Sequence, residues 1–159
     1  MIQRIQTVFL FLVAVAMTLV LTFPIWHQVN PDQSQRMTLN AFNLMTMDIA
    51  SGEVISSESK IFIAILAILA AGLAFFSIFQ YKNRTKQMFI NMINSLVMVT
   101  NVGVIVWISH NANEVFNPQV NGAFVLGFWA ILGGLVMNIL ANRFIRKDEM
   151  LVRSVDRIR

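Results

Sequence analysis

The side chains best placed to do chemistry in this chain are amides within two long apolar stretches. Between residues 88 and 109, at about 100° of rotation per residue, one helix face carries Asn91, Asn94 and Asn101. The stretch at 122–142 carries Asn138 and Asn142 on one face near its far end. If the two stretches are antiparallel helices, these asparagines lie at matching depths and can hydrogen-bond across the helix interface.

Such an asparagine cluster has two interpretations. It could form a polar pathway or a ligand contact, or it could simply hold helices together, at about 0.6 kcal/mol per hydrogen bond. Ion and proton paths usually involve an intramembrane acid, base or histidine, and the apolar stretches contain none. We therefore favour the structural interpretation. If Asn94 and Asn138 touch, their replacement by leucine should change stability non-additively.

Other reactive side chains give no coherent site. His27 and His110 fall near the ends of apolar stretches, on the side that also holds Asp32, Asp48 and Glu114. The expected membrane topology already accounts for the many carboxylates on that side, so their number does not indicate a metal site. We therefore expect no metal. The chain has no cysteine, and its serines at 51–59 have no base placed beside them and no Gly-x-Ser-x-Gly motif. We expect no cofactor and no enzymatic activity.

The second notable element is the basic tail, residues 143–159, in which apolar residues recur at helical spacing. It predicts an amphipathic helix that either lies on anionic inner-leaflet lipid or docks on a partner protein. Nucleic acid is not expected, because no aromatic side chains interleave the basic ones. The candidate docking residues are Arg146, Lys147, Leu151, Arg153, Val155, Arg157, Ile158 and Arg159.

Four uncharged stretches must position these residues. Each has about 17 to 22 residues, which in a helix roughly matches a hydrocarbon core of about 30 Å. The sequence therefore predicts an all-α integral membrane protein, a single domain built as a four-transmembrane-helix bundle. The spans are Thr7–Phe23, Ile61–Tyr81, Met88–Ser109 and Gly122–Asn142.

Small residues indicate how the helices pack. Alanines at 64, 67, 71 and 74 form one narrow stripe, and Gly127, Ala130 and Gly134 offer a matching surface. Close packing is what holds helices together in lipid, so we expect both stripes to face other helices. Phe75, Phe76 and Trp129 are expected nearer lipid.

The segment at 24–60 is too polar to span a membrane. Pro24 ends the first helix, and Trp26 is expected at head-group level. Partial alternation over 37–48, a turn at Ser51–Glu53 and a possible return strand at Val54-Ile55 predict a small extracytoplasmic cap. Either a β-hairpin or an ordered loop with a one-turn helix fits.

Charge gives the orientation. Ten of the twelve Lys and Arg residues fall at the two ends of the chain or at 82–87, whereas only Arg36 and Lys60 lie on the other side. By the positive-inside rule both termini are cytoplasmic, and the first span is read as an uncleaved anchor.

Three segments also carry a family resemblance. Met1–Thr7, Tyr81–Arg84 and Ile145–Arg159 resemble domain of unknown function 4293, a bacterial family with four membrane spans. The resemblance covers the whole chain, and the tail is its most specific part. It implies a small protein of the bacterial inner membrane and supplies no catalytic residues.

These observations favour a non-enzymatic accessory or structural subunit of a larger inner-membrane complex. Its expected partners are anionic lipids and other membrane subunits or further copies of itself. The alternative is a transport or channel component that works as an oligomer, with Asn91, Asn94 and Asn101 along a polar path.

Overall fold

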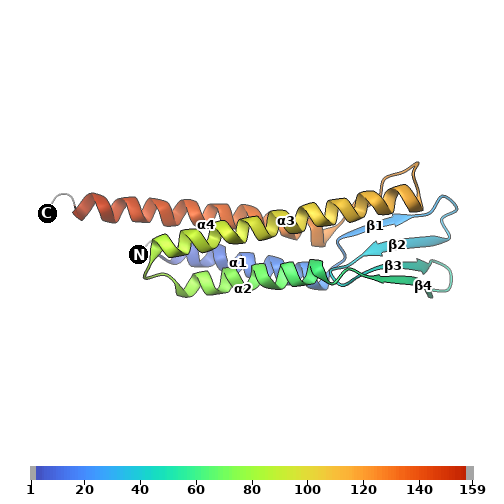
Figure 1. The fold of residues 1–159 in the computed structure, drawn as a ribbon, viewed down its shortest axis with the longest axis horizontal. Coiled ribbons are helices and arrows are strands. Elements are labelled where there is room, and N and C mark those ends of the chain that lie inside the picture. Colours follow the sequence, from blue (N-terminus) through green and yellow to red (C-terminus); the bar gives the residue numbers. More distant parts are fainter. Residues whose placement is uncertain (1–2, 157–159) are drawn as a thin grey trace.

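The computed structural model describes residues 3–156, and the side chains of residues 5–152. A bundle of helices forms one end of the long molecule and a small sheet forms the other (Figure 1). We call these the tail end, where α4 finishes, and the sheet end. The elements in chain order are α1 (Gln3–Thr22), β1 (Trp26–Val29), β2 (Gln35–Leu39), β3 (Asn43–Asp48), β4 (Val54–Ser59), α2 (Phe62–Phe79), α3 (Arg84–Phe116), β5 (Ala123–Phe124) and α4 (Leu126–Asp156).

The expected all-α class is wrong, because the sheet end is a five-stranded antiparallel sheet with the order β4-β3-β2-β1-β5. The predicted turn joins β3 to β4, with Gly52 at φ 72°. The alternating segment at 37–48 is divided between β2 and β3, and strands β1 and β5 were not expected. A strand of two to five residues shows too little alternation to stand out, and its pairing depends on its neighbours.

Trp26 has a fully buried side chain in the core, and its position at head-group level stays a prediction. It pairs with Phe124 across β1 and β5, and Gly122 lies against its indole ring. A Cβ atom at residue 122 would overlap that ring, so the close approach requires glycine.

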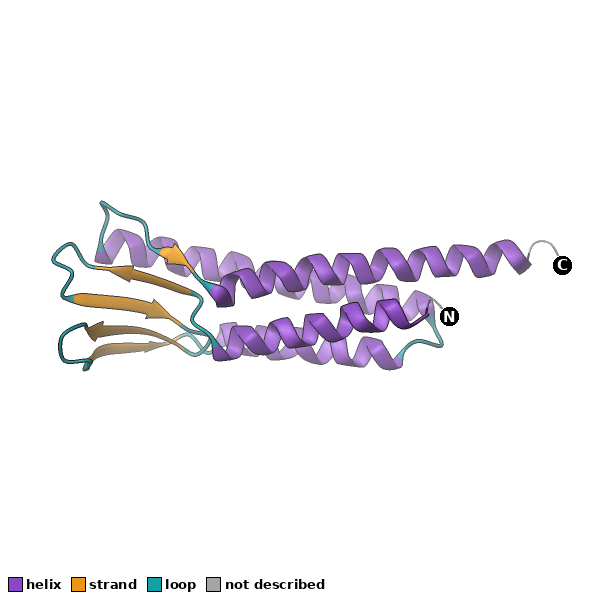
Figure 2. Ribbon diagram, turned by 180° about the vertical axis from the view of Figure 1, so that it is seen from behind, coloured by secondary structure: helices purple, strands orange, loops and turns teal. Residues whose placement is uncertain are grey.

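The four helices are long and apolar enough to cross a membrane, and each overlaps one predicted span. Pro24 lies just beyond the end of α1, as predicted. At 1.5 Å per residue, α3 and α4 are about 50 and 47 Å long, well beyond the thickness of a hydrocarbon core. Figure 2 shows where the excess goes: α3 continues beside the sheet, and α4 continues past the tail end of the bundle.

The helices pack as a ring in which α1 and α3 each contact both α2 and α4. Alanines 64, 67 and 74 on α2 are buried as predicted, together with Ala70, while Ala71 is partly buried. Gly134 lets α4 approach α1, because a Cβ atom there would lie 3.0 Å from the Met17 methyl carbon. Phe75, Phe76 and Trp129 point outward, as expected.

Candidate functional site

The candidate site is a group of buried polar side chains between α2, α3 and α4 in the half of the bundle nearer the tail end. Asn91 and Asn94 lie one helical turn apart on α3, and Asn138 faces them from α4. Their side chains are fully buried. We call the group the amide cluster, and its members are Ser77, Gln87, Asn91, Asn94, Ser95 and Asn138.

Hydrogen bonds in the amide cluster connect three helices. The Ser77 hydroxyl on α2 donates to Asn91 Oδ1 at 2.6 Å, and Gln87 Nε2 donates to the Ser77 carbonyl at 3.0 Å. On the other side, Asn138 Nδ2 donates to the Asn91 carbonyl at 2.7 Å and to Ser95 Oγ at 2.8 Å. Asn91 therefore joins α3 to both of its neighbours.

This network differs from the predicted pairing. Asn138 bonds to Asn91 and Ser95, whereas neither polar atom of the Asn94 side chain has a hydrogen-bond partner. Asn101 lies further toward the sheet end and donates to the Ile63 carbonyl of α2 at 3.3 Å. The structure thus brings Asn91 and Asn138 together and places Asn101 elsewhere. Asn142 is partly buried one turn beyond Asn138.

Several polar atoms of the amide cluster have no partner. They include Gln87 Oε1, Asn91 Nδ2 and Asn138 Oδ1, besides both polar atoms of Asn94. A buried donor or acceptor left unpaired costs about 1–3 kcal/mol. These neutral amides can bind water or a small polar group, but an amide does not ionise and supplies no general acid or base.

At the tail end, an ion pair joins α4 to the start of α3. Arg84 Nη2 lies 3.2 Å from Asp148 Oδ2, Arg84 Nη1 donates to the Asp148 carbonyl at 2.8 Å, and both side chains are mostly buried. The charge pattern placed these residues on the same side of the membrane but did not pair them. A list of every possible Arg–Asp pair between the turn at 82–87 and the tail would have included Arg84–Asp148.

The predicted docking residues of the tail have different outcomes. Arg146 and Lys147 are exposed on α4, and Leu151 is half-exposed beside a small hollow that Ile5 and Phe144 also line. Arg153 and Val155 lie on α4, but their side chains are outside the described part. Arg157, Ile158 and Arg159 are outside the described residues altogether. Up to Asp156 the tail is a direct continuation of α4.

At the sheet end, the structure reveals polar contacts that the sequence did not indicate. Buried Gln28 on β1 donates through Nε2 to the carbonyls of Asn117 and Val120, at 2.9 and 2.6 Å. Asn117 Nδ2 in turn donates to the Val29 carbonyl at 3.1 Å. These bonds attach the loop after α3 to the sheet.

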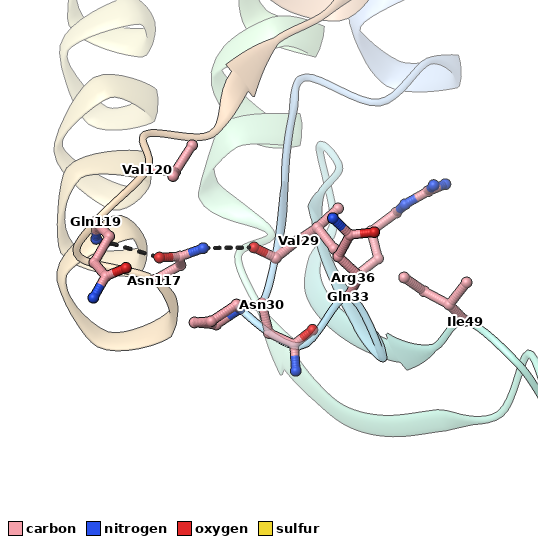
Figure 3. A pocket seen from close by; sticks show the side chains of 9 residues that line it. Val29, Asn30, Gln33, Arg36, Ile49, Asn117, Gln119 and Val120 are labelled. Atoms are coloured by element: carbon pink, nitrogen blue, oxygen red, sulfur yellow. Dashed lines mark hydrogen bonds between the residues drawn. The ribbon is translucent and has the colours of Figure 1, made fainter.

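An open hollow of about 510 Å³ lies beside this junction, with Asn30, Gln33 and Arg36 on one side and Asn117 and Gln119 on the other (Figure 3). In Figure 3, the Asn117 side chain bridges Val29 and Gln119. Both ends of its amide are therefore already used in hydrogen bonds that hold the fold together. The hollow is polar but holds no cluster of acid–base groups.

The histidines do not form a metal centre. His110 Nε2 lies 3.4 Å from Glu114 Oε1, one turn along α3, and both side chains are exposed. His27 is on β1 and pairs with Thr38 across the sheet. No group of three His, Cys, Asp or Glu residues that could hold a metal occurs within the described residues.

A family model described as Domain of unknown function (DUF4293) matches residues 2–158, nearly the whole chain. No curated protein matches the chain.

Proposed function

Because the chain belongs to the DUF4293 family, whose function is unknown, we propose from the structure that it is a non-enzymatic accessory or structural subunit of a bacterial inner-membrane complex. The proposed orientation puts the sheet end outside the cytoplasm. Basic residues support it, because Arg84 and Arg143 lie toward the tail end and only Arg36 and Lys60 lie at the sheet end.

The end of α4 is the observation that carries this proposal. Beyond Asp148, α4 runs past the turn between α2 and α3 (Figure 1). Met150 and Val152 are 57% and 45% exposed there. A straight helix that continues a membrane span cannot also lie flat on the lipid surface, which favours protein docking. Anionic lipid heads would instead meet Arg143 and Arg146.

The amide cluster supports a structural role as well. The helix cores contain alanines and neutral amides, and no ionisable side chain is buried between the helices among the described residues of the predicted spans. Proton and ion carriers usually place an acid, base or histidine there.

Affinity purification in mild detergent, followed by native mass analysis, tests the subunit proposal. We expect one stoichiometric partner. Met150→Asp combined with Val152→Asp should remove that partner, because the variant places two charges on the proposed docking segment. Met150→Leu with Val152→Ile is the matched control, since it keeps the surface apolar. A clean monomer or homo-oligomer from native membranes would overturn the proposal.

A second candidate is a transport or channel component, and the unpartnered atoms of Asn94 and Asn138 favour it. Because these side chains are buried inside one bundle, a path along them would run through each copy and not between copies. It would also have to pass Met98, which is fully buried one turn beyond Asn94. Flux through liposomes that changes in Asn101→Leu would support transport, and unchanged flux would count against it.

A further inference from the structure

We propose that the free edge of β4 is a docking site for an extended segment of a partner protein, which adds a sixth strand to the sheet. This inference rests on the proposed subunit role and names a second surface for it. β4 is the last strand in the sheet order, and all six of its residues are exposed. They include Val54 and Ile55, which are 53% and 54% exposed.

The hydrogen-bonding pattern identifies which groups would bind. The Lys60 amide donates to the Phe42 carbonyl at 2.6 Å, next to the Asn43–Ser59 pair. Because inward and outward groups alternate along an antiparallel strand, Glu58 directs its backbone groups toward β3. Ser57 and Ser59 then direct theirs away from β3. No described strand pairs with that edge.

A cleft of about 220 Å³ lies between α3 and the face of the sheet formed by β2, β3 and β4, and we call it the strand cleft. Leu44 and Glu58 line it from the sheet, and Trp107, Ala112 and Val115 line it from α3. Strand addition uses backbone bonds for affinity and pockets for alternate side chains for specificity. Both features are present here. The edge of β4 offers backbone groups, and the strand cleft, which Glu58 of β4 borders, offers a pocket for a side chain.

The charge of the strand cleft indicates which side chain it would accept. Its one carboxylate, Glu58, is paired with Lys60 at 2.9 Å, so the pair is neutral overall. Apart from the Asn111 amide, the rest of the lining is apolar. The expected ligand is therefore an extended segment with apolar side chains at alternate positions, and without proline where its N–H must bond to β4.

Symmetry argues against a second copy of this chain as the occupant. The strands run along the long axis of the molecule (Figure 1), so two copies in one membrane would bring their β4 strands together in parallel. A two-fold axis would then place Ser57 level with the Ser57 of the other copy. In a parallel ladder, a residue whose backbone groups point to the other strand lies level with a residue whose groups point away. Two Ser57 residues at the same level, related by a two-fold axis, would both point toward each other and cannot form that pattern. The occupant is thus a different chain.

A defined peptide tests the docking site without the native partner. The probe is a fluorescent eight-residue peptide of alternating threonine and leucine, titrated into the full-length protein in nanodiscs and followed by anisotropy. We expect saturable binding and slower hydrogen exchange at the Ser57 and Ser59 amides. Ser57→Pro should weaken binding about tenfold, because it removes one outward N–H group but no bond within the sheet.

Two further variants separate the edge from the strand cleft. Val115→Asp places a charge at the cleft and should also weaken binding, whereas Val120→Asp places the same charge at an exposed position in the hollow near β1. Ser57→Thr keeps the N–H group and should bind normally. Absence of saturable binding, or equal binding by Ser57→Pro, would overturn this inference. Neither result depends on α4, so the subunit proposal stands or fails separately.

Discussion

Asp48 shows how a single side chain fixes the turn between β3 and β4. Its carboxylate accepts hydrogen bonds from the Ser51 amide at 2.8 Å, the Ser51 hydroxyl at 3.2 Å and the Ala50 amide at 2.9 Å. The Ser51 amide contributes most to holding the pKa of this carboxyl below its ordinary value, although partial desolvation opposes the shift. The charged form is the one that the turn stabilises.

This lowered pKa predicts a pH dependence. A carboxyl whose folded pKa lies below its unfolded value of about 3.9 stabilises the fold above that pH, and the contribution is lost as pH falls through the folded pKa. We expect wild type to melt at a higher temperature than Asp48→Asn at pH 6, with the difference shrinking below about pH 4. An equal difference at pH 6 and pH 3 would contradict the assignment.

Asn138 and Asn94 should respond oppositely to the same substitution. Asn138→Leu removes two hydrogen bonds and leaves Ser95 without its amide donor, so the free energy of unfolding should fall by about 1–3 kcal/mol. Unfolding in mixed detergent micelles measures this. An unchanged stability would mean that the bonds to Asn91 and Ser95 contribute nothing net.

Asn94→Leu is expected to leave stability unchanged or to raise it, because the Asn94 amide has no partner to lose. The same unfolding assay applies, with Asn138→Leu for comparison. A loss of stability comparable to that of Asn138→Leu would show that Asn94 holds a bound water or ligand in solution.

At the scale of elements, two adjacent glycines on α4 test the packing of α1 against α4. A Cβ atom at Gly134 would meet Met17 at 3.0 Å and Ala16 at 3.2 Å, whereas at Gly133 it would meet nothing within 4 Å. Gly134→Val should cost about 1–3 kcal/mol of unfolding free energy. Gly133→Val, the matched control, should be close to neutral. Equal effects in detergent unfolding would refute close packing at Gly134.

The helices could be predicted from the sequence, and most of the sheet could not. An uncharged stretch of about 20 residues is a strong signal because lipid enforces it at every position. β5 has only two residues and becomes a strand because β1 lies beside it. The burial of Trp26 likewise depends on β5 and Gly122, which lie beside it in the fold and not in the sequence.

Asn91 and Asn138 meet in the bundle core, but the expected contact between Asn94 and Asn138 is not found. Helical periodicity gives the direction of Asn91 and Asn138, which is why both are found in the bundle core. It does not give the axial offset between two helices. That offset decides whether Asn138 meets Asn94 or, as observed, the Asn91 carbonyl and Ser95.

For the whole molecule, the pair Arg84–Asp148 connects the first residue of α3 to the last turns of α4. We expect Arg84→Gln to increase the motion of a spin label at residue 152, measured by electron paramagnetic resonance. The charge reversal Arg84→Asp with Asp148→Arg should restore the restricted spectrum. Identical spectra in wild type and Arg84→Gln would show that α4 is held by helix packing alone.

The pairing of β1 with β5 has a consequence for biosynthesis. His27 pairs with Ala123, so the partner of β1 on this edge is made nearly 100 residues later. At a synthesis rate of about 5–20 residues per second, β5 is made roughly 5–20 s after β1. Gln28 likewise lacks the carbonyls of Asn117 and Val120 until then. The sheet is therefore completed only after α3 has been synthesised, and a ribosome stalled before residue 117 leaves this edge of β1 without its partner.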